Sequence, residues 1–477
     1  MTRSIIRLSG VLAVLLIALL ANLTYIQVFK ADAYRTATGN SRAVLEEYSR
    51  ERGPILVGRE AVAESVETDG ELKYLRQYPQ GELYAPATGF YSQVYGATGI
   101  EKAENPVLSG YDDRLLFDRL QQLFAGRDPQ GGAVTLTLNA AAQQAAFDGL
   151  AGRPGAVAAL DPRTGEILAL AQSPSFDPNL LSSHKSKQIR DYYTQLTDDP
   201  AEPLLNRPLA AVDPPGSVFK VVVAAAALES GRFTPQTVIP GPATYTLPGT
   251  STQLQNASRT ACSRTDKVTL TEALVVSCNT AFAWLANQLG DDALRAQAEK
   301  FGFGTTFDVP MAAAAGRYPD NPDPAQTALT GIGQYEVRTS AMNMAQVVAA
   351  VAQNGSVMNP FLVKEISSPE LKVLDSTKPT VFGQALSPEH SQELTEMMVQ
   401  VVERGTGSGG AIPGVRVAGK TGTAETGNSA DTVWFASFAP ADTPQVAVAV
   451  VLQGAGGSGG SLAAPIARSV MEAVLNR

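Results

Sequence analysis

Near the start of the chain, the 22 residues from Leu8 to Phe29 include no charged side chain. As a helix, this run is long enough to cross the roughly 30 Å of hydrocarbon in a bilayer. Arg3 and Arg7 precede it, and basic residues mark the cytoplasmic flank of a membrane span. We therefore expect an uncleaved, single-pass anchor at residues 8–29. The N-terminus would lie in the cytoplasm and everything after about Lys30 outside it.

Two other interpretations compete with this anchor. A cleaved signal peptide normally has a shorter apolar region, of about 7–15 residues. A buried core helix would rarely be so uniformly apolar at the very start of a chain. The charge argument for orientation is weakened by Lys30, Arg35 and Arg42, which follow the run.

Composition narrows the class of protein. The chain has 477 residues, of which 44% are hydrophobic and 17% charged, as in a globular protein with a large core. Its net charge is −9, and no Lys- or Arg-rich run offers a phosphate-binding face, so we expect no nucleic acid partner. The two cysteines and two histidines show no metal-ligand spacing, so neither a metal nor another cofactor is predicted.

Turn-forming residues divide the remaining sequence into two regions. Residues 31–52 are polar and predict a juxtamembrane helix. From 53 the pattern is irregular and rich in Gly and Tyr, closed by the turn-forming stretch 126–132. Residues 31–132 therefore predict a small, strand-rich N-terminal domain. A larger domain, 133–477, begins with a β-like segment at 133–138, and Asn139 can cap the Ala-rich helix that follows.

The larger domain has β patterns at both ends and helical patterns between them. The runs 156–160 and 167–171, joined by the turn 161–165, predict a β-hairpin. The other expected elements are helices at 218–229, 270–276, 281–289, 342–353 and 462–475, and strands at 414–424, 433–438 and 445–452. This order predicts an α/β fold in which both ends of the domain share one sheet. The glycine-rich stretch 454–460 is interpreted as a flexible connection.

A serine and a lysine stand three residues apart in the segment Pro214–Lys220. Proline and glycine place Ser217 in the first turn of a new apolar helix, with Lys220 on the same face. A lysine in apolar surroundings has a lowered pKa and can act as a base for a hydroxyl. Alone the pair is weak evidence, because a capping serine and a snorkelling lysine have the same spacing. A second S-x-x-K, Ser182–Lys185, lies in a polar stretch.

Two more motifs follow in order. Ser277-Cys278-Asn279 is the one S-x-N in the sequence, 60 residues after Ser217 and between two helical patterns. Lys420-Thr421-Gly422 is the one K-T-G, another 143 residues along, in a strand pattern that continues with Thr423. The series S-x-x-K, S-x-N and K-T-G marks penicillin-binding proteins and β-lactamases. All three motifs in this order, each on a suitable element, make coincidence implausible.

With these motifs the chain resembles the penicillin-binding transpeptidases over nearly its whole length. The segments that carry the likeness also include 160–165, 173–179, 206–207, 331–334, 423–425 and 434–435. The anchor and small N-terminal domain are similar to the monofunctional class B members, and the size to the actinobacterial penicillin-binding protein A type. The class B pattern R-G-x-I-x-D-R-x-G is present in Arg52–Ile55, but Leu56–Arg59 departs from it.

The resemblance implies a fold, an activity and a reaction. The fold would be an antiparallel sheet flanked by helices. The enzyme would be a serine D,D-transpeptidase that cross-links peptidoglycan. Ser217 would attack a stem peptide ending in D-Ala-D-Ala, and Lys220 would take its proton. Ser277 would pass a proton to the leaving amine, while Asn279 would hold the substrate amide.

The resemblance also implies how the rest of the substrate is held. Lys420, Thr421 and Thr423 would bind its terminal carboxylate. The backbone N–H groups of Ser217 and Thr423 would form the oxyanion hole, and Gly422 would let the strand approach the substrate closely. β-Lactams would acylate the same serine. A membrane glycan polymerase of the cell-wall machinery is the implied protein partner, in cell division or cell shape.

Other functions remain to be compared with this one. Gly456–Gly460 matches the G-x-S-x-G of α/β-hydrolases, but no histidine follows Ser458, and that fold requires one. The intact motifs argue against a non-enzymatic division scaffold. A non-enzymatic β-lactam sensor would normally carry several membrane spans or a cytoplasmic output domain. A D,D-carboxypeptidase differs only in using water as the acyl acceptor, so the sequence leaves it open.

The two cysteines, Cys262 and Cys278, form an even pair that the expected topology places in an oxidising compartment. We expect a disulfide between them, although two buried free thiols would also fit the sequence. In the chain-entropy model a loop of this length contributes roughly 3 kcal/mol. Because Cys278 lies between Ser277 and Asn279, the bridge would fix the S-x-N motif.

Overall fold

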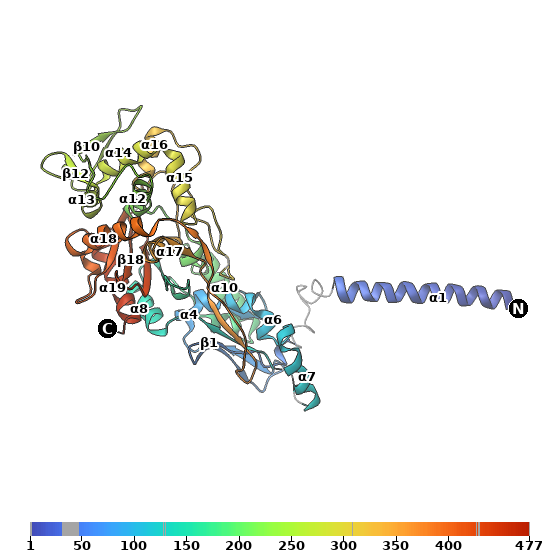
Figure 1. Ribbon diagram of the computed structural model, residues 1–477. Helices are drawn as coiled ribbons and strands as arrows, with labels where there is room; N and C mark the ends of the chain where they lie inside the picture. The colour runs from blue at the N-terminus through green and yellow to red at the C-terminus, as the bar shows by residue number, and fades with distance from the viewer. Residues whose placement is uncertain are drawn as a thin grey trace.

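The computed structural model describes residues 2–30, 47–126, 128, 130–307, 309–425, 427 and 430–476. Helix α1 (Thr2–Thr24) continues into a π-helical turn at Tyr25–Phe29. The stretch Ile5–Gln27 of this continuous helix is long and apolar enough to span a membrane, and none of it is buried. Figure 1 shows α1 standing clear of the folded body. Most of the predicted helix at 31–52 lies outside the described residues.

A five-stranded antiparallel sheet forms the centre of the larger region, as predicted. Its order is β17-β18-β19-β7-β8. The strands are β7 (Gly155–Leu160), β8 (Ile167–Ser173), β17 (Ala418–Ala424), β18 (Thr432–Ala439) and β19 (Val446–Leu452). Strands β7 and β19 pair with Gly155 opposite Leu452, so the two ends of the region meet in one sheet.

Both faces of this sheet are covered by helices. Alternate residues of a strand point to opposite faces, and β19 is buried along its whole length. Its even-numbered residues pack with α8 (Ala140–Leu150) and α19 (Gly459–Val474). The odd-numbered residues face the core that contains α12 (Lys220–Glu229) and α17 (Ala341–Ala352). Asn139 caps α8 by accepting a hydrogen bond from the Ala142 N–H, as predicted.

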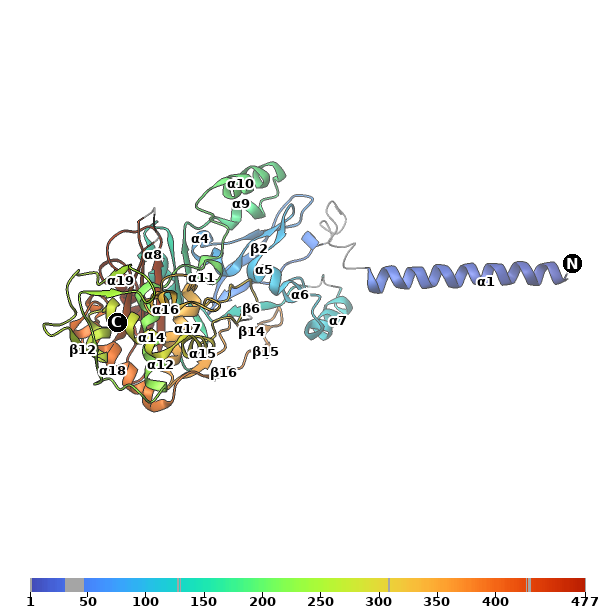
Figure 2. The same cartoon turned by 90° about the horizontal axis from the view of Figure 1, so that it is seen from above.

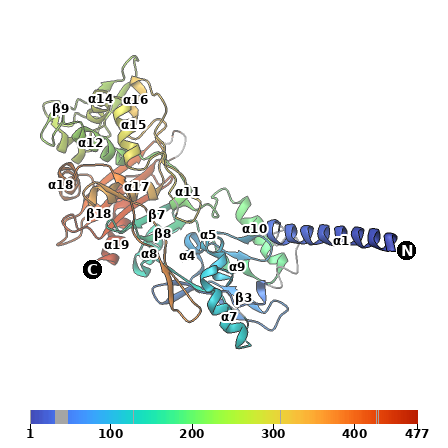
Figure 3. The same cartoon turned by 45° about the vertical axis from the view of Figure 1, so that its right-hand side comes forward.

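Further helices surround α12 at the end of the molecule farthest from α1 (Figures 1 and 3). They are α13 (Leu270–Val275), α14 (Asn279–Leu289), α15 (Asp291–Lys300), α16 (Pro324–Thr330) and α18 (Pro388–Arg404). Residues 220–228 of α12 are all buried, which explains why its sequence is apolar on every side. The sequence patterns did not predict α15, α16 or α18.

A second sheet crosses the predicted domain boundary. Its order is β15-β14-β6-β1-β2-β3. The strands are β1 (Ile55–Val57), β2 (Glu60–Glu67), β3 (Tyr74–Gln77), β6 (Ala133–Leu136), β14 (Val363–Ser367) and β15 (Val373–Ser376). Strand β6 lies parallel to β1 and antiparallel to β14. The N-terminal strands thus share a sheet with strands from the larger region.

The N-terminal region also contains helices that the sequence patterns did not predict. They are α4 (Gly81–Thr88), α5 (Gly99–Ala103), α6 (Asn105–Leu108) and α7 (Leu116–Phe124). Figure 2 shows these helices near β2 and β6, in the part of the body that faces α1.

A buried carboxylate holds the N-terminal region together. Glu101 is fully buried, and its two oxygens each lie 2.6 Å from the Nε of an arginine, Arg52 or Arg76. The Tyr78 hydroxyl donates to the same carboxylate at 3.1 Å. Burial alone would raise the pKa of Glu101, but the two guanidinium groups hold this pKa below its ordinary value.

We expect Glu101→Ala to destabilise this region by about 3–5 kcal/mol, because two guanidinium groups would stay buried without their carboxylate. Thermal unfolding of the full-length protein measures the change. Glu67→Ala is the control, since the Glu67 side chain is 68% exposed and 3.9 Å from Lys73. It should change stability by less than about 0.5 kcal/mol. Equal effects of both substitutions would contradict the prediction.

The same ion cluster predicts a pH dependence. A carboxylate with a lowered folded-state pKa stabilises the fold at pH values above its ordinary pKa. This contribution is lost as the pH falls through the lowered pKa of Glu101.

Candidate active site

Ser217 lies in a short 3-10 turn, Gly216–Phe219, that runs directly into α12. Gly216 has a φ of +53°, and a Cβ there would lie 2.3 Å from the carbonyl oxygen of Thr423. On its other side, the N–H of Gly216 donates to the carbonyl of Gly333 at 3.0 Å. The turn that carries Ser217 therefore packs between β17 and the loop of residues 331–334, and only glycine fits at position 216.

Lys220 is the first residue of α12 and is fully buried. Its Nζ donates to the backbone carbonyl of Ser277 and to Oδ1 of Asn279, both at 2.8 Å, and lies 3.3 Å from Oγ of Ser277. Burial, followed by the nearby charge of Lys420, lowers the pKa of Lys220 well below its ordinary value. A neutral amine, the form that can accept a proton, is therefore accessible.

Lys420 reaches Ser277 from β17. Its Nζ donates to Oγ of Ser277 at 3.0 Å and to the carbonyl of Thr421 at 2.8 Å. Burial lowers the pKa of Lys420 to about 7. The Ser277 hydroxyl therefore lies between two lysine amines, from residues 200 positions apart in the sequence.

The tight turn between α13 and α14 sets the position of Ser277. Ser277 has a φ of +56°, a left-handed conformation that a residue with a Cβ seldom adopts. The N–H of Cys278 donates to the carbonyl of Ala273 at 2.8 Å and closes the turn. Asn279 then begins α14, and its Nδ2 donates to the carbonyl of Gln255 at 3.2 Å.

The K-T-G strand, β17, is an edge strand of the five-stranded sheet. A Cβ on Gly422 would lie 2.8 Å from the carbonyl oxygen of Pro215 and 3.0 Å from the side chain of Val218. Glycine is thus required here because the strand packs against the turn that carries Ser217. Thr421 is buried, whereas Thr423 is exposed.

The sequence matches the penicillin binding protein transpeptidase domain family over residues 155–472. The chain belongs to this family. Residues 52–134 match the penicillin binding protein A dimerisation domain. The transpeptidase is a class B member, similar to the actinobacterial penicillin-binding protein A type.

Individual relatives agree with this assignment. The chain is 43% identical to the peptidoglycan D,D-transpeptidase PbpA of Mycobacterium tuberculosis, over 100% of this chain and 99% of that protein. The ceftriaxone acyl-enzyme complex of penicillin-binding protein A from M. tuberculosis superposes with a TM-score of 0.88 at 43% identity, covering 90% of this chain and 100% of that one. A D,D-transpeptidase domain from Eggerthella lenta superposes with a TM-score of 0.79 at 31% identity, covering 90% and 98%.

Thr406, which sequence reasoning missed, links two motifs of the transpeptidase. Its Oγ1 lies 2.7 Å from Oγ1 of Thr421, and its N–H donates to the carbonyl of Val275, just before the S-x-N turn, at 3.3 Å. An ion pair of 2.7 Å between Arg404 and Glu272 joins the same two segments. In the sequence, Gly405-Thr406-Gly407 signals only the end of a helix.

The two cysteines of the transpeptidase lie beside the S-x-N turn. Cys262 and Cys278 are joined by a disulfide with a Cα–Cα distance of 5.9 Å, within the usual range of ~4.4–6.8 Å. The bridge ties the loop before β12 (Lys267–Thr269) to the middle residue of the motif.

The two other motif-like serines have structural roles. Ser182 is buried, and its hydroxyl donates to the carbonyl of Arg76 at 3.0 Å. Ser458 caps α19 by accepting from the N–H of Ser461 at 3.2 Å. The interpretation of residues 454–460 as a flexible connection is wrong at its end, because Gly459 begins α19. A Cβ at Gly459 would lie 2.1 Å from the carbonyl oxygen of Trp434.

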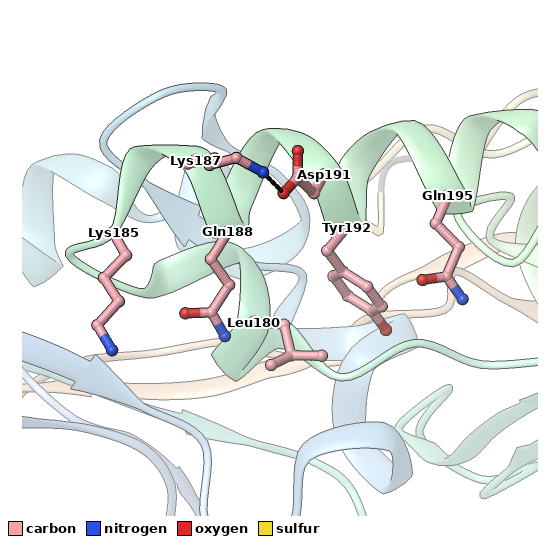
Figure 4. A pocket seen from close by; sticks show the side chains of 7 residues that line it. All are labelled: Leu180, Lys185, Lys187, Gln188, Asp191, Tyr192 and Gln195. Atoms are coloured by element: carbon pink, nitrogen blue, oxygen red, sulfur yellow. Dashed lines mark hydrogen bonds and ion pairs between the residues drawn. The ribbon is translucent and has the colours of Figure 1, made fainter.

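A surface hollow of about 480 Å³ lies between α9 (Pro178–Ser182) and α10 (Ser186–Asp198), away from the motifs. Figure 4 shows its lining: Leu180, Lys185, Lys187, Gln188, Asp191, Tyr192 and Gln195. No residue of the S-x-x-K at Ser217, of the S-x-N or of the K-T-G lines it, and the Lys187 ammonium is paired with Asp191 at 2.6 Å. Over the described residues, no cluster of His, Cys, Asp and Glu could hold a metal ion.

We expect Thr406→Val to slow acylation by penicillin about 2- to 10-fold, the value of one hydrogen bond, because Thr421 loses its hydroxyl partner. Thr406→Ser keeps the hydroxyl and should acylate at nearly the rate of the unchanged protein. Stopped-flow acylation measures both variants. A normal rate in Thr406→Val together with a loss in Thr406→Ser would mean that Thr406 acts through packing alone.

Proposed function

We propose that this chain is a serine D,D-transpeptidase that cross-links peptidoglycan stem peptides through an acyl-enzyme on Ser217. The observation that carries this proposal is the position of the Ser277 hydroxyl, 3.3 Å from the amine of Lys220 and 3.0 Å from that of Lys420. Three groups that can donate or accept a proton thus meet beside the turn that holds Ser217. The family membership supports the same reaction.

Acylation begins with the serine hydroxyl. The neutral amine of Lys220 accepts the proton of Ser217 as Oγ bonds to the carbonyl carbon of the penultimate D-Ala. The carbonyl oxygen becomes an oxyanion, which the backbone N–H groups of Ser217 and Thr423 stabilise. Such a donor is worth roughly 3–4 kcal/mol. The close contact of Gly216 with Thr423 supports this assignment, because it brings the two backbone segments together.

The terminal D-Ala then leaves. The Lys220 ammonium gives its proton to the leaving amine through the Ser277 hydroxyl, and the C–N bond breaks. The amine of a second stem peptide later attacks the ester, releases Ser217 and forms the cross-link. Asn279 holds the substrate amide, and its side chain is oriented for this by Lys220 and Gln255.

The substrate carboxylate binds at β17. Lys420 supplies the positive charge, and Thr421 and Thr423 supply hydroxyl groups. A bound carboxylate favours the ammonium form of Lys420, whose pKa burial lowers to about 7. The edge position of β17 supports binding of an extended peptide alongside it, because one side of an edge strand has unpaired backbone groups.

The buried, connected lysines support an enzyme rather than a sensor or scaffold. A D,D-carboxypeptidase would use the same acyl-enzyme with water as the acceptor.

In this proposal the chain has three parts: an anchor at 8–29, an N-terminal domain at 31–132 and a transpeptidase domain at 133–477. The catalytic domain lies outside the cytoplasm, where Cys262 and Cys278 can be oxidised, and a membrane glycan polymerase supplies the glycan strands.

Penicillin should form a stable covalent adduct with the purified protein, on Ser217, and Ser217→Ala should abolish it. Mass spectrometry of digested protein locates the adduct. Ser182→Ala is the control and should label normally, because the Ser182 hydroxyl is bonded to backbone carbonyls, those of Arg76 and Pro178 among them. Normal labelling of Ser217→Ala would exclude the proposed nucleophile.

Lys220→Arg should reduce acylation about 10²- to 10⁴-fold, the usual contribution of a general base, because guanidinium stays protonated. For the unchanged enzyme, acylation should slow as the pH falls through the lowered pKa of Lys220. Lys187→Arg, at an exposed lysine, should acylate normally. Near-normal acylation by Lys220→Arg would place the base elsewhere.

The orientation of the chain is tested with reporters fused to its C-terminus. An alkaline phosphatase, active only outside the cytoplasm, should be active there. A cytoplasm-dependent fluorescent protein should stay dark. The opposite result would contradict both the orientation and the proposed peptidoglycan substrate.

A further inference from the structure

Helix α7 presents its apolar side to the outside of the folded body. The exposed residues of this side are Leu116, Phe117, Leu120 and Phe124, of which Phe117 is 70% and Phe124 91% exposed. The last three follow Leu116 by one, four and eight positions, and residues with this spacing lie on one side of a helix. On a water-soluble protein this side would normally face the core.

The polar side of α7 faces the body instead. Gln122 is buried, and its Oε1 accepts from the N–H of Gln130 at 3.0 Å. Arg119 donates to the carbonyl of Gly110 at 3.1 Å, and Leu115, just before the helix, is buried. These contacts fix the rotation of α7, so its apolar side cannot turn inward without breaking them.

This helix lies where the chain enters the body from the anchor. The N–H of Gly131 and the side chain of Gln130 donate to Glu51 at 2.9 and 2.7 Å. The Arg50 guanidinium lies 4.7 Å from the ring centre of Tyr111. Residues 50–51 therefore contact both ends of the segment that carries α7. In Figures 1 and 2, α7 is at the end of the body that faces α1.

We infer that the apolar side of α7 lies in the outer surface of the membrane that α1 spans. This inference rests on the proposed anchoring of the chain. An amphipathic helix parallel to a bilayer buries its apolar face about 5–10 Å into the headgroup and acyl boundary. Because α1 already holds the protein at the membrane, the second contact is intramolecular in effect, and weak affinity suffices.

A tryptophan introduced at Phe124 reports this contact in the full-length protein. Phe124→Trp, Leu16→Trp and Val238→Trp are placed in nanodiscs of phosphatidylcholine and phosphatidylglycerol, with and without bromine on the acyl chains. Leu16 lies in α1. Val238, 59% exposed, lies in β9 (Val238–Pro240) at the far end of the body. The unchanged protein gives the background from its two native tryptophans.

Bromine should quench the Leu16→Trp and Phe124→Trp signals several-fold more than that of Val238→Trp. The inference is overturned if Phe124→Trp is quenched no more than Val238→Trp while Leu16→Trp is quenched. Blue-shifted but unquenched emission from Phe124→Trp would also overturn it, because a protein surface would then cover α7. An unquenched Leu16→Trp would refute the anchor itself, whereas penicillin labelling tests the catalytic proposal separately.

Discussion

The active site depends on the burial of two lysine side chains beside one serine. An ammonium group without solvent is costly unless oxygen atoms surround it. Lys220 and Lys420 are both fully buried, and their hydrogen-bond acceptors come from the S-x-N turn and from β17. Because burial disfavours the charged form of an amine, it lowers the pKa values of both lysines. The same packing that stabilises α12 therefore also lowers the pKa of Lys220, as its proposed role as a base requires.

Close contacts between backbones bring the three motifs together. The Ser217 turn lies between β17 and the loop of residues 331–334, at separations that leave no room for a Cβ on Gly216, Gly333 or Gly422. Thr406 links the S-x-N turn to the K-T-G strand through one backbone and one side-chain hydrogen bond. With these contacts, groups from distant segments hold fixed positions before any substrate binds, which is what electrostatic catalysis requires.

The N-terminal region is joined to the catalytic region by more than a covalent linker. Strand β6 pairs with β1 on one side and with β14 on the other, and β14 follows α17, a helix of the core beneath the five-stranded sheet. A movement of the N-terminal strands would therefore have to break ladder hydrogen bonds or move the catalytic region with it. The ion cluster around Glu101 makes the N-terminal part of this unit rigid.

The sequence by itself determined the apolar N-terminal helix, the five-stranded sheet with its helices and the three motifs, because these follow from local periodicity and from residue types at fixed spacing. It did not determine α18, α7 or the role of Thr406. Nor did it show that Gly422 lies against Pro215, where a Cβ would not fit. Only the tertiary structure decided these, along with the sheet that crosses residue 132. The physical reason is that burial, lowered pKa values and backbone contacts arise between residues far apart in the chain, and local patterns carry no record of such pairs.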